Sequence, residues 1–535
     1  MKKRIIALLT CLAILTGSLG CQKAQTETEV VVETPVVEEV TMEDNYRTYY
    51  EVFVYSFYDE NGDGIGDLKG LTQKLDYISE DLGCNGIWLM PIMPSPSYHK
   101  YDVTDYYSID PEYGTMEDFE AFIEACNERG IKVIIDLVLN HSSSQHPWFK
   151  EACSYLASLG DSEPSMEECP YVDYYHFTKE KQSDYYPVPG SDVWYYEARF
   201  YDGMPDLNLY NEDLRKEIEG IVGFWLEKGV GGFRLDAVQE YETGSVESNV
   251  EILAWLNQTV KEKREDAYLV GEVWTDLNTY AQYYESGIDS VFDFEFAGNE
   301  GLIASTVKGT MSASGYGKAL ENAQNTFQSY NVNYIDAPFY TNHDMPRSAG
   351  YYAGEESASQ TKMAGALNLL MSGNAFIYYG EELGMKGAGK DENKRAPMYF
   401  STDENAEGMC SGPADMDSVK MKYGSLEEQK EDATSIYQYY KQAIYLRNLY
   451  PIIRKGSVKS LDAYASDTIA AFEKVLEDEK LVVFCNVSTE AASIDLSAME
   501  GIEKGIENGL YVGEETAVYE EGTLTIPAYG IEFIK

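Results

Sequence analysis

The sequence predicts an α/β protein: a (β/α)8 TIM barrel with a domain inserted after the third strand and a C-terminal β-sandwich. Three observations support this. From about Asn45, short apolar runs alternate with amphipathic helical segments, the pattern of a parallel sheet covered by helices. Residues 142–206 leave that alternation, far beyond the usual length of a βα loop. After about Arg454 the helical pattern gives way to short β-like runs.

The barrel elements can be placed in order along the chain. Between Asp67 and Gly83 apolar residues recur at helical spacing, and Gly83 supplies a stop. Thr115 is expected to cap a second helix, and a third should bury apolar residues between Leu214 and Leu226. No glycine-rich phosphate turn follows the first strand, which favours a barrel over an open nucleotide-binding sheet. The eight strand candidates are residues 51–57, 86–91, 131–137, 230–236, 268–271, 290–294, 337–341 and 375–379.

The N-terminus is typical of an export signal. Residues 2–4 are basic, and residues 5–17 form an apolar run that is short for a membrane span. The segment Ser18-Leu19-Gly20-Cys21 resembles a lipobox, so Cys21 is expected to carry lipid, and the alternative is a plain secretory signal. We expect a signal peptide (1–20), an acidic disordered tether (21–44), a barrel domain (45–455) with an insert (142–207), and a β-sandwich (456–535). This predicts an extracellular protein held on a bacterial cell membrane only by its lipid, or else a secreted one.

Composition limits the partners. A formal net charge of −50 would repel phosphates, which argues against a nucleic-acid partner. The 45 tyrosines exceed the 19 phenylalanines, and this excess suits surfaces that are flat and wet, as sugar-binding clefts are. No cysteine spacing suggests a zinc site, and a Cys153–Cys169 bridge stays open.

Four predicted strands end in polar clusters, at the end of a barrel where chemistry is usually placed. These are Asp136-Leu-Val-Leu-Asn-His141, Arg234-Leu-Asp236, Gly271-Glu272-Val-Trp274 and Asn342-His343-Asp344. An isolated acid is usually a solvated surface group. Asp236, Glu272 and Asp344, together with two histidines and an arginine at four strand ends, point instead to a catalytic site.

These segments, in this order, resemble the conserved regions of the α-amylase family, glycoside hydrolase family 13. Met204-Pro-Asp-Leu-Asn208 resembles a fifth region, in the form typical of the group intermediate between oligo-1,6-glucosidases and neopullulanases. The resemblance covers almost everything after the tether and implies a retaining hydrolase of α-glucans.

By the same resemblance, Asp236 would be the nucleophile, Glu272 the general acid/base and Asp344 the transition-state stabiliser. Arg234 and Asp236 are two apart on a strand and so face the same way, and the guanidinium should keep Asp236 ionised. Glu272 must hold a proton, which burial and a neighbouring carboxylate favour. The substrate-binding residues implied are His99, Tyr101, His141, Arg234, His343, Arg347 and Arg395.

A second motif follows the first strand: Asp59-Glu-Asn61-Gly-Asp63-Gly-Ile65-Gly-Asp67. Oxygen ligands at alternate positions, with glycines permitting a tight loop, suit calcium. The motif resembles the calcium loop of oligo-1,6-glucosidases, with Ile65 giving its carbonyl, and implies a structural Ca²⁺. The alternative is an Asx-rich turn without metal.

Ala237 resembles the residue found in members that act on α-1,4 bonds of starch and maltodextrins. The family's Lys-His pair beyond it is replaced by Gln239-Glu240, which leaves the binding of the leaving sugar open. Three alternatives remain: an α-glucan transglycosylase, a cyclomaltodextrinase or neopullulanase with mixed α-1,4 and α-1,6 activity, and, from another class, a non-catalytic surface glucan binder.

Overall fold

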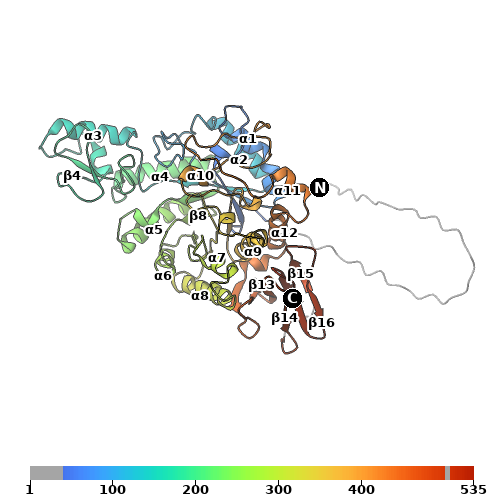
Figure 1. Cartoon of the computed structure of the whole chain (residues 1–535). Coiled ribbons are helices and arrows are strands. Elements are labelled where there is room, and N and C mark those ends of the chain that lie inside the picture. The colour runs from blue at the N-terminus through green and yellow to red at the C-terminus, as the bar shows by residue number, and fades with distance from the viewer. Residues whose placement is uncertain (1–39, 501–505) are drawn as a thin grey trace, which may run out of the picture. The chain divides into compact units, whose positions relative to one another are not determined.

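The computed structural model describes residues 40–500 and 506–535. Seven parallel strands form the central sheet in the order β10-β1-β2-β3-β7-β8-β9, and helices surround it (Figure 1). The neighbours β3 and β7 pair in register, which sets Asp136 beside Arg234. The strands are β1 (Thr48–Val52), β2 (Gly86–Leu89), β3 (Lys132–Leu137), β7 (Gly232–Leu235), β8 (Tyr268–Gly271), β9 (Ser290–Val291) and β10 (Ala375–Tyr378).

The sheet closes through the seventh predicted segment, residues 337–341. Parallel bridges join Phe292, just after β9, to Ala337, and Phe339 to Phe376 in β10. Segment 337–341 therefore lies between the two edge strands, although it forms bridges and not a continuous ladder. The predicted TIM barrel is confirmed.

Helices follow the strands as expected of βα units. The barrel helices are α1 (Leu68–Gln73), α2 (Met116–Glu128), α4 (Glu212–Glu227), α5 (Val246–Lys263), α6 (Leu277–Tyr280), α7 (Leu302–Val307), α8 (Ser314–Tyr330) and α9 (Ser357–Leu369). Further helices are α10 (Asp391–Lys394), α11 (Leu426–Glu431), α12 (Ile436–Leu449) and α13 (Pro451–Lys455).

Two helices show how local sequence sets the elements. Thr115 caps α2 in a capping box with Asp118, which satisfies N–H groups that would otherwise lack partners. Asn211 caps α4 by accepting from the backbone of Asp213 and Leu214. One face of α4 is buried, with the periodicity that the sequence predicts, and its buried residues are Leu214, Ile218, Ile221, Val222, Trp225 and Leu226.

The first strand was predicted at the wrong position. It spans Thr48–Val52, and residues 54–56 form a 3-10 turn, whereas residues 51–57 were expected. Because β1 lies between two strands and is buried throughout, its run of apolar and aromatic residues carries no alternation that would mark its ends. The predicted helix after Asp67 is likewise split, into α1 and a π-helical turn at Tyr77–Asp81.

The insert after β3 contains α3 (Pro147–Leu159) and a small antiparallel sheet in the order β4-β6-β5. His146 caps α3 by accepting from the Trp148 N–H, a structural role. Cys153 and Cys169 are free thiols, so the bridge left open above is not formed. The three strands are β4 (Phe177–Thr178), β5 (Tyr185–Pro187) and β6 (Tyr195–Glu197).

A β-sandwich follows α13. Its sheets have the orders β11-β12-β13-β18-β15 and β14-β17-β16, and a core that includes Phe484 and Leu524 lies between them. The barrel helix α8 meets this domain, since the Gln324 side chain bonds both backbone groups of Val458. The strands are β11 (Ser457–Ser460), β12 (Ile469–Leu476), β13 (Glu479–Asn486), β14 (Ala492–Asp495), β15 (Ile506–Leu510), β16 (Val518–Glu520), β17 (Thr523–Ile526) and β18 (Ile531–Ile534).

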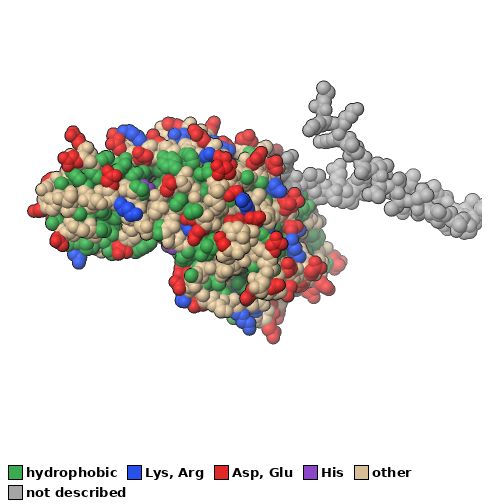
Figure 2. Space-filling view, turned by 90° about the horizontal axis from the view of Figure 1, so that it is seen from above, with side chains coloured by type: hydrophobic (Ala, Val, Ile, Leu, Met, Phe, Trp, Pro, Cys, Tyr) green, Lys and Arg blue, Asp and Glu red, His purple; other side chains and the backbone are tan. Residues whose placement is uncertain are grey.

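The predicted signal, Cys21 and most of the tether lie outside the described residues. The tether was expected to reach Asp44, yet Asp44 pairs with Lys455, and the Thr41 carbonyl accepts from Arg47. Within residues 40–500 and 506–535, no helix combines the length and the apolarity needed to cross a bilayer. Acidic side chains are spread over the face seen in Figure 2, in keeping with the net charge of −50.

Candidate active site

The polar clusters predicted at four strand ends meet at one end of the barrel. Asp136 lies in β3 and Arg234 in β7, Asp236 directly follows β7, and Glu272 directly follows β8. Asp344 follows the segment that closes the barrel. In a closed parallel sheet these positions share one rim, so residues that lie far apart in the sequence become neighbours.

Arg234 holds three carboxylates. Its Nη1 donates to Asp136 Oδ1 at 2.8 Å and to Asp236 Oδ1 at 2.6 Å, and its Nη2 lies 3.0 Å from Glu272 Oε2. The guanidinium is planar, cannot be deprotonated in proteins and is 1% exposed here, so it fixes Asp236 and Glu272 beside one another. The expectation that Arg234 and Asp236 face the same way is met.

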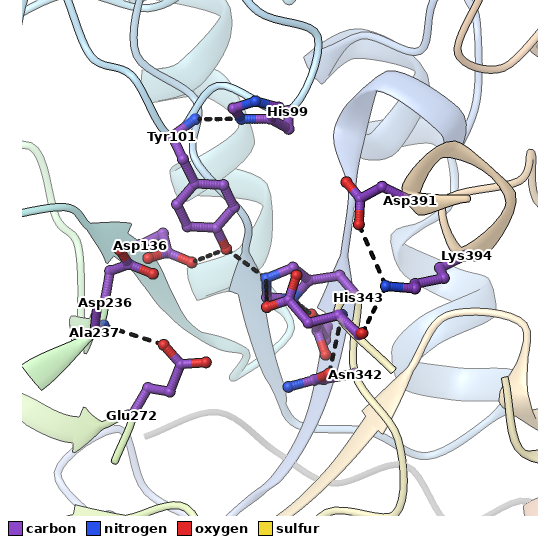
Figure 3. A network of polar contacts seen from close by, with 12 residues as sticks. His99, Tyr101, Asp136, Asp236, Ala237, Glu272, Asn342, His343, Asp391 and Lys394 are labelled. Atoms are coloured by element: carbon purple, nitrogen blue, oxygen red, sulfur yellow. Dashed lines mark hydrogen bonds and ion pairs between the residues drawn. The ribbon is translucent and has the colours of Figure 1, made fainter. Parts of the chain in front are cut away.

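Glu272 is placed by the neighbouring turn. The Ala237 N–H donates to Glu272 Oε2 at 3.1 Å (Figure 3). Ala237 adopts a left-handed backbone conformation (φ 47°, ψ 42°), which is uncommon for a residue other than glycine. Burial raises the pKa of Glu272, the charge of Arg234 opposes this, and the neighbouring Asp236 and Asp344 raise it further. The net direction favours the protonated form that a general acid needs.

Asp344 is held in the opposite charge state. Burial alone would raise its pKa, but the charges of His343 and Arg395 bring the pKa of Asp344 well below its ordinary range. His343 Nε2 lies 3.1 Å from Asp344 Oδ2, and Arg395 Nη2 lies 3.2 Å from Asp344 Oδ1. The rim thus carries one carboxyl group biased toward protonation and one firmly ionised.

His343 is itself held by acids on both sides. Its Nδ1 lies 2.6 Å from Glu51 Oε1, so Glu51 and Asp344 contact the two nitrogens of one buried ring. Burial lowers the pKa of His343, but Asp344 and Glu51 outweigh that effect and raise it to about 10. Near neutral pH the ring is therefore a cation.

We expect His343 to stay doubly protonated from pH 5.5 to 8.5, because its raised pKa lies above that window. His146, whose pKa burial lowers to about 4, should stay neutral over the same range. The chain has only five histidines, so ¹⁵N spectra of histidine-labelled protein can follow each ring, with His343→Asn assigning the cationic signal. A His343 signal that titrates with a midpoint near 6.5 would contradict this expectation.

An open cavity of about 420 Å³ exposes part of this network. Asp236, Glu272 and Asp344 all line it, as do the predicted substrate-binding residues His99, Tyr101, His141 and Arg395. The remaining lining residues are Phe200, Met204, Ala237, Gln239, Glu240, Trp274, Asp391 and Lys394. Its volume falls in the range of small-molecule sites.

The aromatic and imidazole groups of the cavity differ in how they are held. The Tyr101 hydroxyl bonds Asp136 Oδ2 at 3.0 Å and His343 Nε2 at 2.7 Å, which fixes the ring at the cavity wall. His141 Nε2 is buried and has no hydrogen-bond partner. A buried polar atom without a partner beside a cavity is suited to bind a ligand hydroxyl.

Two predicted substrate-binding residues, besides Arg234, lie behind the cavity wall. His343 acts on the site through Asp344 and Tyr101. Arg347 is buried, and its guanidinium donates to the carbonyls of Tyr379 and Lys394. The assignment of Arg347 to substrate binding stays a prediction: two nitrogens of its guanidinium hold the backbone beside Arg395, and Arg347 is not among the residues that line the cavity.

The loop predicted to bind calcium turns back on itself. Asp59 accepts from the N–H groups of Gly62 and Gly64, Asp63 from Ile65, and Asp67 from Glu60 and Asn61. These bonds form an Asx-rich turn, and the described residues contain no group of three acidic, histidine or cysteine side chains poised for a metal. The donors are all oxygens, as calcium prefers, so a structural ion there stays a prediction.

Sequence reasoning did not assign a role to Asp136 or Glu51. Both are buried, 1% exposed, and bond Arg234 and His343 respectively. An acid inside an otherwise apolar strand is the signal that could have identified them, because a buried carboxylate needs a partner. Asp391 and Lys394 of α10 were also missed, and they contact Arg395 and the Asp344 carbonyl.

The arrangement can carry out substitution at an acetal carbon. A carboxylate can attack, a protonated carboxyl group can release the leaving oxygen, and a second ionised carboxylate can stabilise the positive charge that develops between them. All three line one cavity.

Comparison with known proteins gives consistent results. The protein-family model described as alpha amylase, catalytic domain, matches residues 51–456 of this chain. The solved structure of Eubacterium rectale Amy13B is 50% identical, has a TM-score of 0.90, and the match covers 94% of this chain and 97% of that one. Alpha-amylase 3 of Dictyoglomus thermophilum is 38% identical over 82% of this chain and 84% of its own length. Trehalose-6-phosphate hydrolase of Bacillus subtilis is 30% identical over 83% of this chain and 89% of its own length.

Proposed function

Since the chain belongs to the α-amylase family of glycoside hydrolases, whose members act on α-glucans, we propose that it cleaves α-1,4-glucosidic bonds in starch or maltodextrins with retention of configuration. The observation that carries the proposal is the pairing of Asp236 and Glu272 on one guanidinium at a cavity wall. The relatives' names include activities on different bonds, so the linkage rests on this chain's own residues.

In the first half-reaction, Asp236 attacks the anomeric carbon while Glu272 donates its proton to the glycosidic oxygen. The bond between carbon and leaving oxygen breaks, and the cleaved sugar becomes an ester of Asp236. Arg234 holds Asp236 in place through the hydrogen bond from Nη1 to Oδ1. The ionised Asp344 stabilises the sugar as positive charge develops.

In the second half-reaction, the ionised Glu272 takes a proton from water, and the water oxygen displaces Asp236 from the same carbon. Two inversions give net retention. If a sugar hydroxyl replaces water, the same steps produce transglycosylation, so the acceptor that reaches Glu272 sets the balance between the two reactions.

The α-1,4 assignment is supported by the position of Ala237. This small residue lines the cavity, directly follows the predicted nucleophile and contacts the predicted acid. At this position the chain resembles the members of the family that act on α-1,4 bonds.

The decisive measurement is product analysis with amylose, pullulan and cyclodextrins as substrates. We expect amylose to yield new reducing ends that are α-anomers when formed, and pullulan to be cut at α-1,4 rather than α-1,6 positions. Binding of amylose without new reducing ends would overturn the proposal in favour of a glucan-binding protein. Cleavage of pullulan confined to α-1,6 bonds would overturn the linkage.

A further inference from the structure

The pair Gln239-Glu240, which stands where the family resemblance leads one to expect Lys-His, makes a contact that the proposed mechanism does not use. Glu240 ends the short turn Val238–Glu240 that follows Asp236 and Ala237. Its Oε2 lies 3.0 Å from Arg199 Nε, in the domain inserted after β3. Glu240 is also among the residues that line the cavity. One ion pair thus joins the nucleophile's own turn to the inserted domain.

The chemistry tells which part of the cavity this turn borders. A general acid protonates the leaving oxygen, so the leaving sugar lies beyond Glu272. Figure 3 shows Asp236, Ala237 and Glu272 on one side of the network and Asp391 and Lys394 on the other. Gln239, Glu240 and Trp274 belong to the segments that directly follow Asp236 and Glu272. The leaving sugar therefore enters the part of the cavity lined by Gln239, Glu240 and Trp274.

Two large aromatic side chains are exposed in the cavity lining. Phe200 is 50% exposed and Trp274 is 47% exposed, and both line the cavity. Trp274 stacks on Phe294, and the Phe200 ring contacts His141 edge to face at 5.2 Å. Large apolar surfaces left in water beside a site are typical of ligand contacts, and flat rings suit the apolar faces of pyranose rings.

Phe200 sits directly after Arg199, and its segment is attached at two points. The Arg199 N–H donates to Asp206 Oδ2, and Asp206 Oδ1 accepts from Asn140 after β3. The Arg199 side chain makes the second attachment, to Glu240. Arg199 Nη1 also lies 3.6 Å from Asp184 Oδ2, but Asp184 belongs to the inserted domain as well, so the ion pair with Glu240 is what ties the Arg199 side chain to the barrel.

We propose that the Arg199–Glu240 ion pair positions Phe200 as an aromatic wall of the site that receives the leaving glucosyl unit. Phe200 would contact that sugar, and Arg199 and Glu240 would be positioning residues that act through it. This inference rests on the proposed function, and it predicts that these residues matter only when the leaving group is a sugar.

Two substrates separate the roles. Maltoheptaose and α-maltosyl fluoride both place sugars on the side away from Glu272, but fluoride leaves without filling the leaving-sugar site. Phe200→Ala should lower kcat/KM on maltoheptaose by about tenfold, because a stacking contact is lost, and leave α-maltosyl fluoride within about twofold of wild type. The matched control is Tyr201→Ala: Tyr201 is 40% exposed, adjacent in sequence and not part of the cavity lining, so both substrates should stay within about twofold.

The positioning residues are tested by a double-mutant cycle. Glu240→Gln keeps the side chain's length but removes its charge, and Arg199→Met removes the partner. Because the pair is partly exposed, each should raise KM on maltoheptaose by about threefold with little change in kcat, and the double variant should be no worse than either single variant. Wild-type KM should rise with ionic strength, and KM of Glu240→Gln should not.

Equal losses on both substrates in Phe200→Ala would overturn the inference, as would additive effects in the cycle. If wild-type enzyme fails to hydrolyse α-maltosyl fluoride, it is the proposed function that fails. A wild-type enzyme that hydrolyses it, with a Phe200→Ala variant unchanged on maltoheptaose, refutes the inference alone.

Discussion

Asp236→Asn is expected to reduce kcat on maltooligosaccharides by a factor of about 10⁴ or more, because an amide cannot form the covalent intermediate. The substitution changes one atom in a side chain that lines the cavity, so the fold and substrate binding should persist. Reducing ends released from amylose measure the rate, and thermal unfolding with binding of maltoheptaose checks the fold.

The matched control is Asp136→Asn. Asp136 contacts the same Arg234 nitrogen as Asp236 but lies behind the cavity wall, 1% exposed. Burial raises the pKa of Asp136 to about 7 despite the charge of Arg234, so its charge is less essential near neutral pH. The Asp136→Asn substitution should reduce kcat by no more than about 100-fold, because Arg234 and Tyr101 would be misplaced. Equal reductions of kcat by the two substitutions would contradict the assignment of Asp236 as the nucleophile.

Glu272→Gln should lower kcat on maltooligosaccharides by about 10³- to 10⁴-fold, because the leaving sugar then departs without a proton. The first step with α-maltosyl fluoride should be much less affected, since fluoride is a good leaving group that needs little protonation. The burst of fluoride that accompanies formation of the ester on Asp236 measures this step.

Azide gives a further test of the same variant. The second half-reaction of Glu272→Gln lacks its base, so the ester on Asp236 should accumulate until an anion that needs no deprotonation attacks it. Added azide should restore turnover and give α-maltosyl azide, because attack on the β-linked ester of Asp236 inverts the anomeric carbon a second time. Formation of the β-azide, or no rescue with an intact fold, would contradict the assignment of Glu272 or the retaining course.

The fold and the rim of the site were predictable to different degrees. The buried face of α4 follows from helical periodicity alone, and the capping of α2 by Thr115 from local hydrogen bonding. Strand ends were less predictable: β1 begins three residues earlier than expected, because a strand buried on both faces shows no alternation to mark its boundaries.

The positions of the proposed catalytic side chains at one rim were easier to predict than the groups that hold them. Asp236, Glu272 and Asp344 stand in motifs whose meaning is local. Glu51 contacts His343 across 292 positions of the chain, and Arg199 meets Glu240 across 41. Such partners are decided by barrel closure and by the packing of the inserted domain, and no local pattern encodes either. For Arg347 the local motif was less informative. The motif predicted contact with the substrate, but in the structure the guanidinium donates to the Tyr379 and Lys394 carbonyls.

The left-handed backbone conformation of Ala237 couples two properties that protein engineering would need to change separately. Its N–H donates to Glu272, the proposed proton donor, and Ala237 also lines the cavity in which we expect the substrate to bind. A β-branched replacement would bring steric strain to that peptide, on top of the roughly 1–2 kcal/mol that this conformation already costs an L-residue. A substitution of Ala237 made to change the linkage preference would therefore also disturb the backbone that positions Glu272. Neighbouring positions such as Val238 would have to be changed together with Ala237.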